Sequence, residues 1–187
     1  MTQNLATTDF SIRAPLLLWL RRLYSDDLSA KMLEEFKMPR PSARIDIALV
    51  NGEMAGYEIK SDRDNLRRLK VQIPAYAKVF DKVSLVTTAK HLEEAEAKVP
   101  HWWGILVFDD AGQFRIARAS KQNKGVDVRA LLFALSRNEL LQVARMANVS
   151  LYRLGRKEEM VDALSSATTS RAMFNYAREV LKLRRAG

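Results

Sequence analysis

The sequence lacks cysteine altogether and has only two histidines among its 187 residues. Without cysteine the chain can form no disulfide, thiol nucleophile, iron–sulfur cluster or cysteine-bearing zinc site. His91 and His101 are too few to build a zinc site from imidazoles alone. A bound metal ion would therefore be held mainly by carboxylates, which favours a hard ion such as Mg²⁺ or Mn²⁺.

Long hydrophobic runs are also missing. The longest, PLLLWL at residues 15–20, ends at Arg21 and Arg22, far short of the roughly 20 apolar residues that a membrane span requires. Nothing basic precedes an apolar run near Met1, so no signal peptide is expected. These patterns together predict a cytoplasmic protein with no membrane partner.

Acidic residues are scarce in the C-terminal part of the chain. Residues 1–110 hold 16 Lys and Arg against 16 Asp and Glu, whereas residues 111–187 hold 15 against 6, which accounts for the whole formal charge of +9. A basic module of this kind favours a polyanionic partner, with DNA, in duplex form, as the first expectation. The alternative is a solvated basic surface with no partner.

The order of expected elements indicates an α/β core followed by an all-helical extension. Strand-like alternation and helical spacing of apolar residues are distinguished by their periods of about two and 3.6 residues. The core, residues 1–120, is predicted to be a mixed sheet flanked by helices, and residues 126–187 a basic helical extension. The helices are expected at about 11–24, 26–36, 62–80, 91–99, 138–147, 156–166 and 169–185, and the strands at 44–50, 53–60, 82–88, 103–108 and 114–119.

Two of these strands carry charged residues where apolar ones are expected. Asp46 lies within RIDIALV (44–50), and Glu58 and Lys60 flank Ile59 in the next strand. Glu58 and Lys60 share one face because strand side chains alternate. Buried charges are costly unless they are paired or bound to a metal. Two carboxylates and an ammonium that meet across a hairpin could fix a divalent ion and promote phosphodiester hydrolysis.

The register of this hairpin tests the interpretation. A two-residue Asn51-Gly52 turn would pair Val50 with Glu53 and turn Asp46 and Glu58 to opposite faces. Asp46 opposes Glu58 only if Val50 pairs with Met54, which needs a longer loop. We therefore predict a loop at 51–53, against the simplest turn signal.

Three further residues could belong to the same site. If residues 26–36 form a helix, Glu35 lies on its inward stripe and Glu34 points to solvent. Glu35 could then complete a metal site, or pair with an arginine at the edge of the stripe. Gln72 and Tyr76 lie four residues apart on one helix face, which is also compatible with an ordinary pair at the edge of the core.

These residues together resemble the PD-(D/E)XK nuclease superfamily. Asp46 matches the metal-binding aspartate of that superfamily, and Glu58-Ile59-Lys60 matches the (D/E)XK triplet. The sequence departs from the pattern at the first position of the "PD" pair, where it has Ile45. The run from ARIDIALV to KVSLV is similar to a small bacterial and phage branch of the superfamily.

Other motifs extend the resemblance. Glu35 suits the glutamate that many members carry on the helix before the sheet, and Gln72 with Tyr76 is similar to the QxxxY motif of the RecB-like branch. The resemblance implies a restriction-endonuclease-like core and a Mg²⁺- or Mn²⁺-dependent deoxyribonuclease. It implies metal ligands at Asp46, Glu58, the backbone carbonyl of Ile59 and Glu35, with Lys60, Gln72 and Tyr76 completing the catalytic set.

Basic residues on the helices are expected to contact DNA. Segment 139–164 resembles a SAP-type helix–loop–helix, a small module that binds duplex DNA, although a plain helical hairpin packed on the core is the competing interpretation. The expected phosphate contacts are Arg63, Arg67, Arg68, Lys70, Arg156, Lys157, Arg171, Arg178, Arg184 and Arg185.

Two other functions are compatible with the sequence. One is a catalytically silent nuclease fold that serves as a DNA-binding or regulatory module. The other is an adaptor whose hairpin carboxylates form a structural salt bridge with Arg44 or Arg63. The sequence leaves the oligomeric state open, and a homodimer of the nuclease would let two sites cut two strands.

Overall fold

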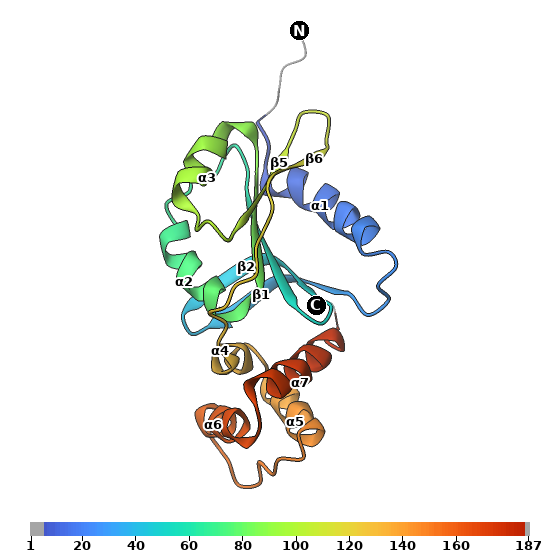
Figure 1. Ribbon diagram of the computed structural model, residues 1–187, viewed down its shortest axis with the longest axis vertical. Helices are drawn as coiled ribbons and strands as arrows, with labels where there is room; N and C mark the ends of the chain where they lie inside the picture. Colours follow the sequence, from blue (N-terminus) through green and yellow to red (C-terminus); the bar gives the residue numbers. More distant parts are fainter. Residues whose placement is uncertain (1–5, 186–187) are drawn as a thin grey trace.

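The computed structural model describes residues 6–185, which form an α/β core and a C-terminal helical region (Figure 1). A six-stranded mixed sheet has the order β1-β2-β3-β4-β5-β6. The expected fold class is therefore confirmed. The strands are β1 (Lys31–Pro39), β2 (Ser42–Val50), β3 (Met54–Lys60), β4 (Lys82–Thr87), β5 (Gly104–Phe108) and β6 (Phe114–Arg118).

Helices cover both faces of the sheet. Helix α1 (Asp9–Leu23) lies on one face, and α2 (Leu69–Val79) and α3 (Leu92–Lys98) lie on the other (Figure 1). The neighbouring pairs β3–β4 and β4–β5 are parallel and the other three pairs are antiparallel, and α2 connects β3 to β4. The sheet thus separates two hydrophobic clusters, a smaller one under α1 and a larger one under α2 and α3.

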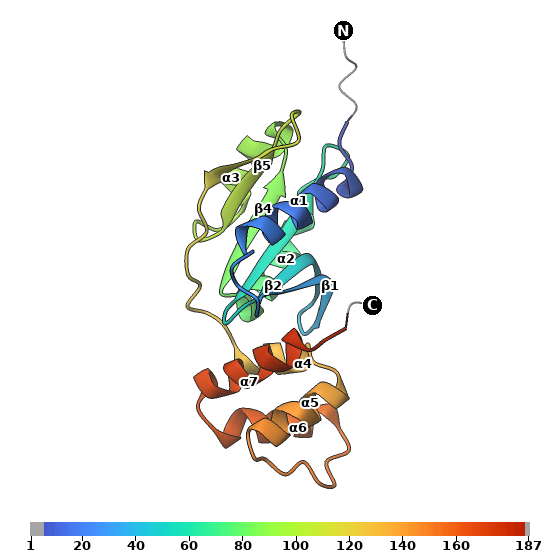
Figure 2. The same ribbon diagram turned by 90° about the vertical axis from the view of Figure 1, so that its right-hand side faces the viewer.

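Four helices form the C-terminal region: α4 (Val128–Phe133), α5 (Arg137–Met146), α6 (Lys157–Ala167) and α7 (Ser170–Lys182). A capping box between Ser136 and Glu139 begins α5, and the Thr169 side chain caps α7, close to the expected helix starts at 138 and 169. These helices lie beyond one end of the sheet (Figure 2). Among the described residues, no helix is long and apolar enough to cross a membrane.

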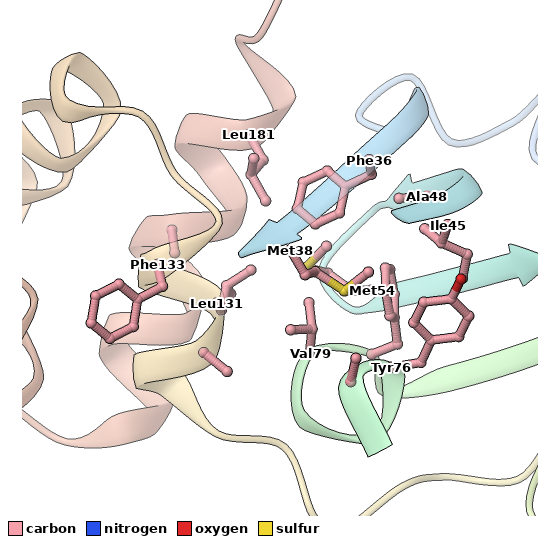
Figure 3. Close-up of a cluster of buried hydrophobic side chains, with 14 of the residues drawn as sticks. Phe36, Met38, Ile45, Ala48, Met54, Tyr76, Val79, Leu131, Phe133 and Leu181 are labelled. Carbon is pink, nitrogen blue, oxygen red and sulfur yellow. The ribbon is translucent and has the colours of Figure 1, made fainter. Parts of the chain in front are cut away.

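The helical region shares a hydrophobic core with the sheet. Leu131 of α4 and Leu181 of α7 belong to the same buried cluster as Phe36 and Met38 of β1 (Figure 3). Arg178 of α7 adds a buried ion pair with Asp81, whose carboxylate also accepts a hydrogen bond from the Met54 amide at 2.6 Å. The extension is therefore packed against the core, as a helical hairpin on the core would be.

One expected element is wrong. Residues 26–36 are not a helix, because β1 occupies Lys31–Pro39 and pairs antiparallel with β2. Its buried residues Leu33 and Phe36 are three apart, a spacing typical of a helix. They reach the same cluster because Glu35 between them has a positive φ of 54°, which breaks the alternation of the strand.

Helix α2 is shorter than predicted, whereas the hairpin loop is confirmed. The helix begins at Leu69 instead of Asp62, and Pro74 lies inside it without ending it. Val50 pairs with Met54, so residues 51–53 form the β2–β3 loop. Continued by one residue, this register sets Asp46 opposite Glu58, although the paired part of β2 and β3 ends at Ile47 and Tyr57.

Candidate functional site

The candidate site lies where β1 and β2 depart together from regular strand geometry. Glu35 falls between Glu34, which pairs with Ile47, and Phe36, which pairs with Ile45, so Glu35 stands opposite Asp46. Both strands lose their alternation at this pair, since Ile45 packs in the cluster under α2 and Ile47 in the cluster under α1. A positive φ at a residue other than glycine costs on the order of 1 kcal/mol or more and is often found at functional sites.

Arg13 of α1 joins the two acidic residues of this irregular pair. Its Nη2 atom lies 2.9 Å from Glu35 Oε1 and 2.8 Å from Asp46 Oδ1, and its Nη1 donates to the Asp46 carbonyl at 3.1 Å. Asp9 anchors the same guanidinium through an ion pair of 2.7 Å. The guanidinium of Arg13 therefore forms an ion pair with Asp46, the candidate metal-binding aspartate.

Asp46 also contacts the strand that carries the (D/E)XK-like triplet. Its Oδ2 accepts a hydrogen bond from the Ile59 amide at 2.7 Å. Burial and the nearby charge of Glu58 raise the pKa of Asp46 to about 6, although the Ile59 amide and Arg13 oppose this shift. Asp46 therefore contacts the backbone of the residue that stands between Glu58 and Lys60.

Glu58 is buried in a polar network on the α2 side of the sheet. Its Oε1 accepts hydrogen bonds from Lys60 Nζ at 2.5 Å and Gln72 Nε2 at 2.7 Å, and its Oε2 lies 2.6 Å from the Tyr76 hydroxyl. Burial and the charge of Glu58 raise the pKa of Tyr76, which therefore remains a hydroxyl donor. The structure thus brings together Glu58, Lys60, Gln72 and Tyr76, four of the residues that the sequence assigned to the site.

Glu35 reaches the site by a route that the sequence did not predict. It projects from β1 and not from a helix, and Arg13 and Arg44 hold its two oxygens at 2.9 Å and 2.6 Å. Glu34 is exposed, as expected, but it is exposed as a residue of strand β1 and not of a helix. Sequence reasoning missed Arg13, for which the only signal was an arginine beside the apolar stripe of Ile12 and Leu16.

The donor atoms fit a hard metal ion better than a soft one. Within residues 6–185, no three His, Asp or Glu side chains converge as a metal site, so Glu35 does not complete a three-carboxylate set. Asp46, Glu58 and the Ile59 carbonyl offer oxygen donors only, which suits Mg²⁺ or Mn²⁺. Gln72 adds a buried Oε1 atom that has no hydrogen-bond partner among the described residues.

The basic residues divide into three groups by their surroundings. Arg63, Arg67, Arg68 and Lys70 are exposed around the start of α2, and Arg156, Arg171 and Arg185 are exposed in the helical region. Lys157 and Arg184, together with Arg68 of the first group, line a cavity between the helical region and the β1–β2 hairpin. Arg178 is buried and paired with Asp81, so its expected contact with phosphate is wrong.

Comparisons with known proteins place the chain in one family. The model for the bacteriophage P4 protein cII family matches residues 3–186, and the chain belongs to that family. Protein cII of Enterobacteria phage P4 is 31% identical over 130 residues, which are 65% of this chain and 48% of the relative. The chain thus spans about half the length of this curated relative.

A solved structure resembles part of the fold. The SPO1766 protein of unknown function from Silicibacter pomeroyi matches with a TM-score of 0.46 and 22% sequence identity. The match covers 75% of this chain and 94% of that protein.

Proposed function

We propose that the protein is a metal-dependent phosphodiesterase that cleaves DNA, with Asp46, Glu58 and Lys60 at its catalytic centre. The observation that carries the proposal is the hydrogen bond of 2.7 Å from the Ile59 amide to Asp46, because Ile59 stands between Glu58 and Lys60 in β3. Lys60 Nζ lies 2.5 Å from Glu58 Oε1, so two carboxylates and an ammonium belong to neighbouring positions of β2 and β3. A divalent cation would stabilise carboxylates that are held in a partly buried site.

The residues around the carboxylates have distinct parts in this proposal. Asp46, Glu58 and the Ile59 carbonyl would hold the ion, with Gln72 Oε1 beside them. A bound ion supplies charge neutralisation at the phosphate and lowers the pKa of a water molecule. Tyr76 and Gln72 fix the orientation of Glu58 through hydrogen bonds of 2.6 Å and 2.7 Å. Lys60 supplies an ammonium that orients the water or stabilises the developing negative charge.

The alternative is a catalytically silent nuclease fold that binds DNA. One specific observation favours it: the site already has its own counter-charges, because Arg13 pairs with Asp46 and Lys60 pairs with Glu58. A site that is fully neutralised by protein cations would not need a metal. The two functions are separated by whether Mn²⁺ binds and whether binding depends on Asp46.

Cleavage assays test the proposal directly. Plasmid, linear duplex and single-stranded DNA are incubated with the protein in Mg²⁺ or Mn²⁺, alongside Lys60→Ala and the exposed-lysine control Lys124→Ala. We expect the wild type and the control to cut, and Lys60→Ala to cut at least about 100-fold more slowly. The proposal is wrong if no substrate is cut, or if Lys60→Ala cuts as fast as the wild type.

A binding measurement separates the two functions without relying on turnover. We expect Mn²⁺ to raise the melting temperature of the wild type and to have a much smaller effect on Asp46→Asn, because a ligand that binds only the folded state stabilises it. A melting temperature unaffected by Mn²⁺ would support the silent module.

A further inference from the structure

A large cavity lies between the β1–β2 hairpin and the helical region. It has a volume of about 950 Å³. We call it the basic cleft and define it by its lining residues: Lys37, Met38, Pro39, Ser42, Ala43, Arg44, Arg68, Phe133, Ala134, Leu135, Ser136, Glu139, Lys157 and Arg184. Its walls therefore come from β1, β2, the segment before α2, and the helices beyond the sheet.

The charge of the basic cleft is strongly positive. Five of its lining residues are Lys or Arg, and Glu139 is the single acidic one. Glu139 is already neutralised, since its carboxylate lies 2.6 Å from Arg184 Nε and accepts a hydrogen bond from the Ser136 amide at 2.7 Å. Glu139 therefore offsets the charge of Arg184 alone and leaves the other four basic residues of the cleft unaffected.

Three of the cleft cations remain available to a ligand. Lys37 and Arg68 form no ion pair within the described part of the chain. Lys157 Nζ donates one hydrogen bond, to the Phe133 carbonyl at 2.8 Å, and retains two further N–H donors. Burial lowers the pKa of Lys157, so an anion in the cleft would favour its charged form.

The basic cleft is linked to the carboxylate site through Arg44 and Arg68. The Arg44 carbonyl accepts a hydrogen bond from the Tyr76 hydroxyl at 2.6 Å, and that hydroxyl also contacts Glu58. The Arg68 carbonyl accepts a hydrogen bond from the backbone amide of Gln72 at 3.1 Å. Two residues that line the cleft therefore contact Tyr76 and Gln72, the α2 residues that hold Glu58.

We infer that the basic cleft binds the phosphodiester backbone of one DNA strand and leads it to Asp46 and Glu58. The inference rests on the proposed function and assigns its substrate-binding surface. Cations spread over two strands, a loop and the helical region suit a chain of phosphates better than one small anion. The helical region would thus contribute to binding through Lys157 at the cleft.

Binding without cleavage tests the inference. Anisotropy of a fluorescein-labelled duplex is measured over a range of salt concentrations in EDTA, with the double variant Lys37→Gln/Lys157→Gln. The control, Arg21→Gln/Lys124→Gln, removes the same charge from exposed positions outside the cleft. We expect the cleft variant to bind more weakly, with a dependence of log K on log salt that is shallower by about two. Urea unfolding of each variant checks that the fold is retained.

The outcomes separate this inference from the proposed function. The cleft inference is overturned if the cleft variant keeps the wild-type affinity and salt dependence, or if the control weakens binding equally. It is also overturned if a mononucleotide binds as tightly as the duplex, since the cleft would then hold a single anion. If the cleft variant alone loses affinity but the wild type never cuts DNA with Mg²⁺ or Mn²⁺, the nuclease proposal fails and the cleft inference stands.

Discussion

The buried ion pair between Arg178 and Asp81 offers a sharp test of how the helical region is attached. Their side chains are 10% and 7% exposed, and the guanidinium also donates to the Gly52 carbonyl at 2.8 Å. Replacing Arg178 by Met keeps most of the apolar volume but removes every one of these contacts. The Asp81 carboxylate would then remain buried with the Met54 amide as its main donor.

The expected cost of Arg178→Met is large. Removing one partner of a buried ion pair destabilises a protein by about 3–5 kcal/mol, because the other charge is left buried without compensation. Total stabilities are about 5–15 kcal/mol, so the variant would lose a substantial part of the whole. If the uncompensated charge is the cause, Asp81→Asn/Arg178→Met should lose less than the sum of the two single variants.

Urea unfolding followed by circular dichroism measures these differences. The matched control is Arg171→Met on the same helix, which removes an exposed arginine and should change the free energy of unfolding by no more than about 0.5 kcal/mol. The reasoning is refuted if Arg178→Met is as stable as Arg171→Met. A loss of DNA affinity in Arg178→Met without a loss of stability would instead restore Arg178 as a phosphate contact.

Two further predictions concern the carboxylate site. Burial and Glu58 raise the pKa of Asp46 to about 6, so the folded state holds this proton more tightly than the unfolded chain does. The stabilisation that this proton gives is complete below about pH 4 and is lost as the pH rises through about 6, and it amounts to at most about 3 kcal/mol. Urea titrations from about pH 4 to 7 measure it. The free energy of unfolding of Asp46→Asn should depend less on pH than that of the wild type. Arg13→Gln should lower the free energy of unfolding by about 1–3 kcal/mol in EDTA, because Asp46 and Glu35 lose their shared cation. Mn²⁺ should restore part of that loss, and an Arg13→Gln variant as stable as the wild type would contradict this role.

The sequence predicts most of the fold because its strands and helices have clear periods. The β2–β3 hairpin is the strongest case, since the need to bring Asp46 opposite Glu58 predicted the 51–53 loop against the Asn51-Gly52 turn signal. The expected start of α5 at about 138 is within one residue of Arg137, where the helix begins behind a capping box between Ser136 and Glu139. Local patterns of this kind are decided by nearby residues, so one sequence is enough to find them.

Contacts between distant segments could not be predicted in the same way. Arg178 and Asp81 are 97 residues apart, and an arginine on a basic amphipathic helix looks the same in sequence whether it meets solvent or a buried carboxylate. Arg13 and Asp46 are 33 residues apart and meet only because α1 packs on the face of the sheet beside β2. The charged residues in the strands could be recognised from the sequence, but the arginines that pair with them could not.

The error at β1 and the location of the site have one physical cause. Glu35 has a positive φ, so Leu33 and Phe36 turn to the same cluster and imitate the spacing of a helix. The same irregularity lies opposite Asp46, where β2 also loses its alternation and its pairing with β3 ends. In a regular pair of strands, the side chains of Glu35 and Asp46 would both point to the same face of the sheet, because opposite residues share a face. In the irregular pair, both carboxylates are instead partly buried and contact Arg13. This geometry also allows Asp46 of β2 to accept a hydrogen bond from the Ile59 amide of β3.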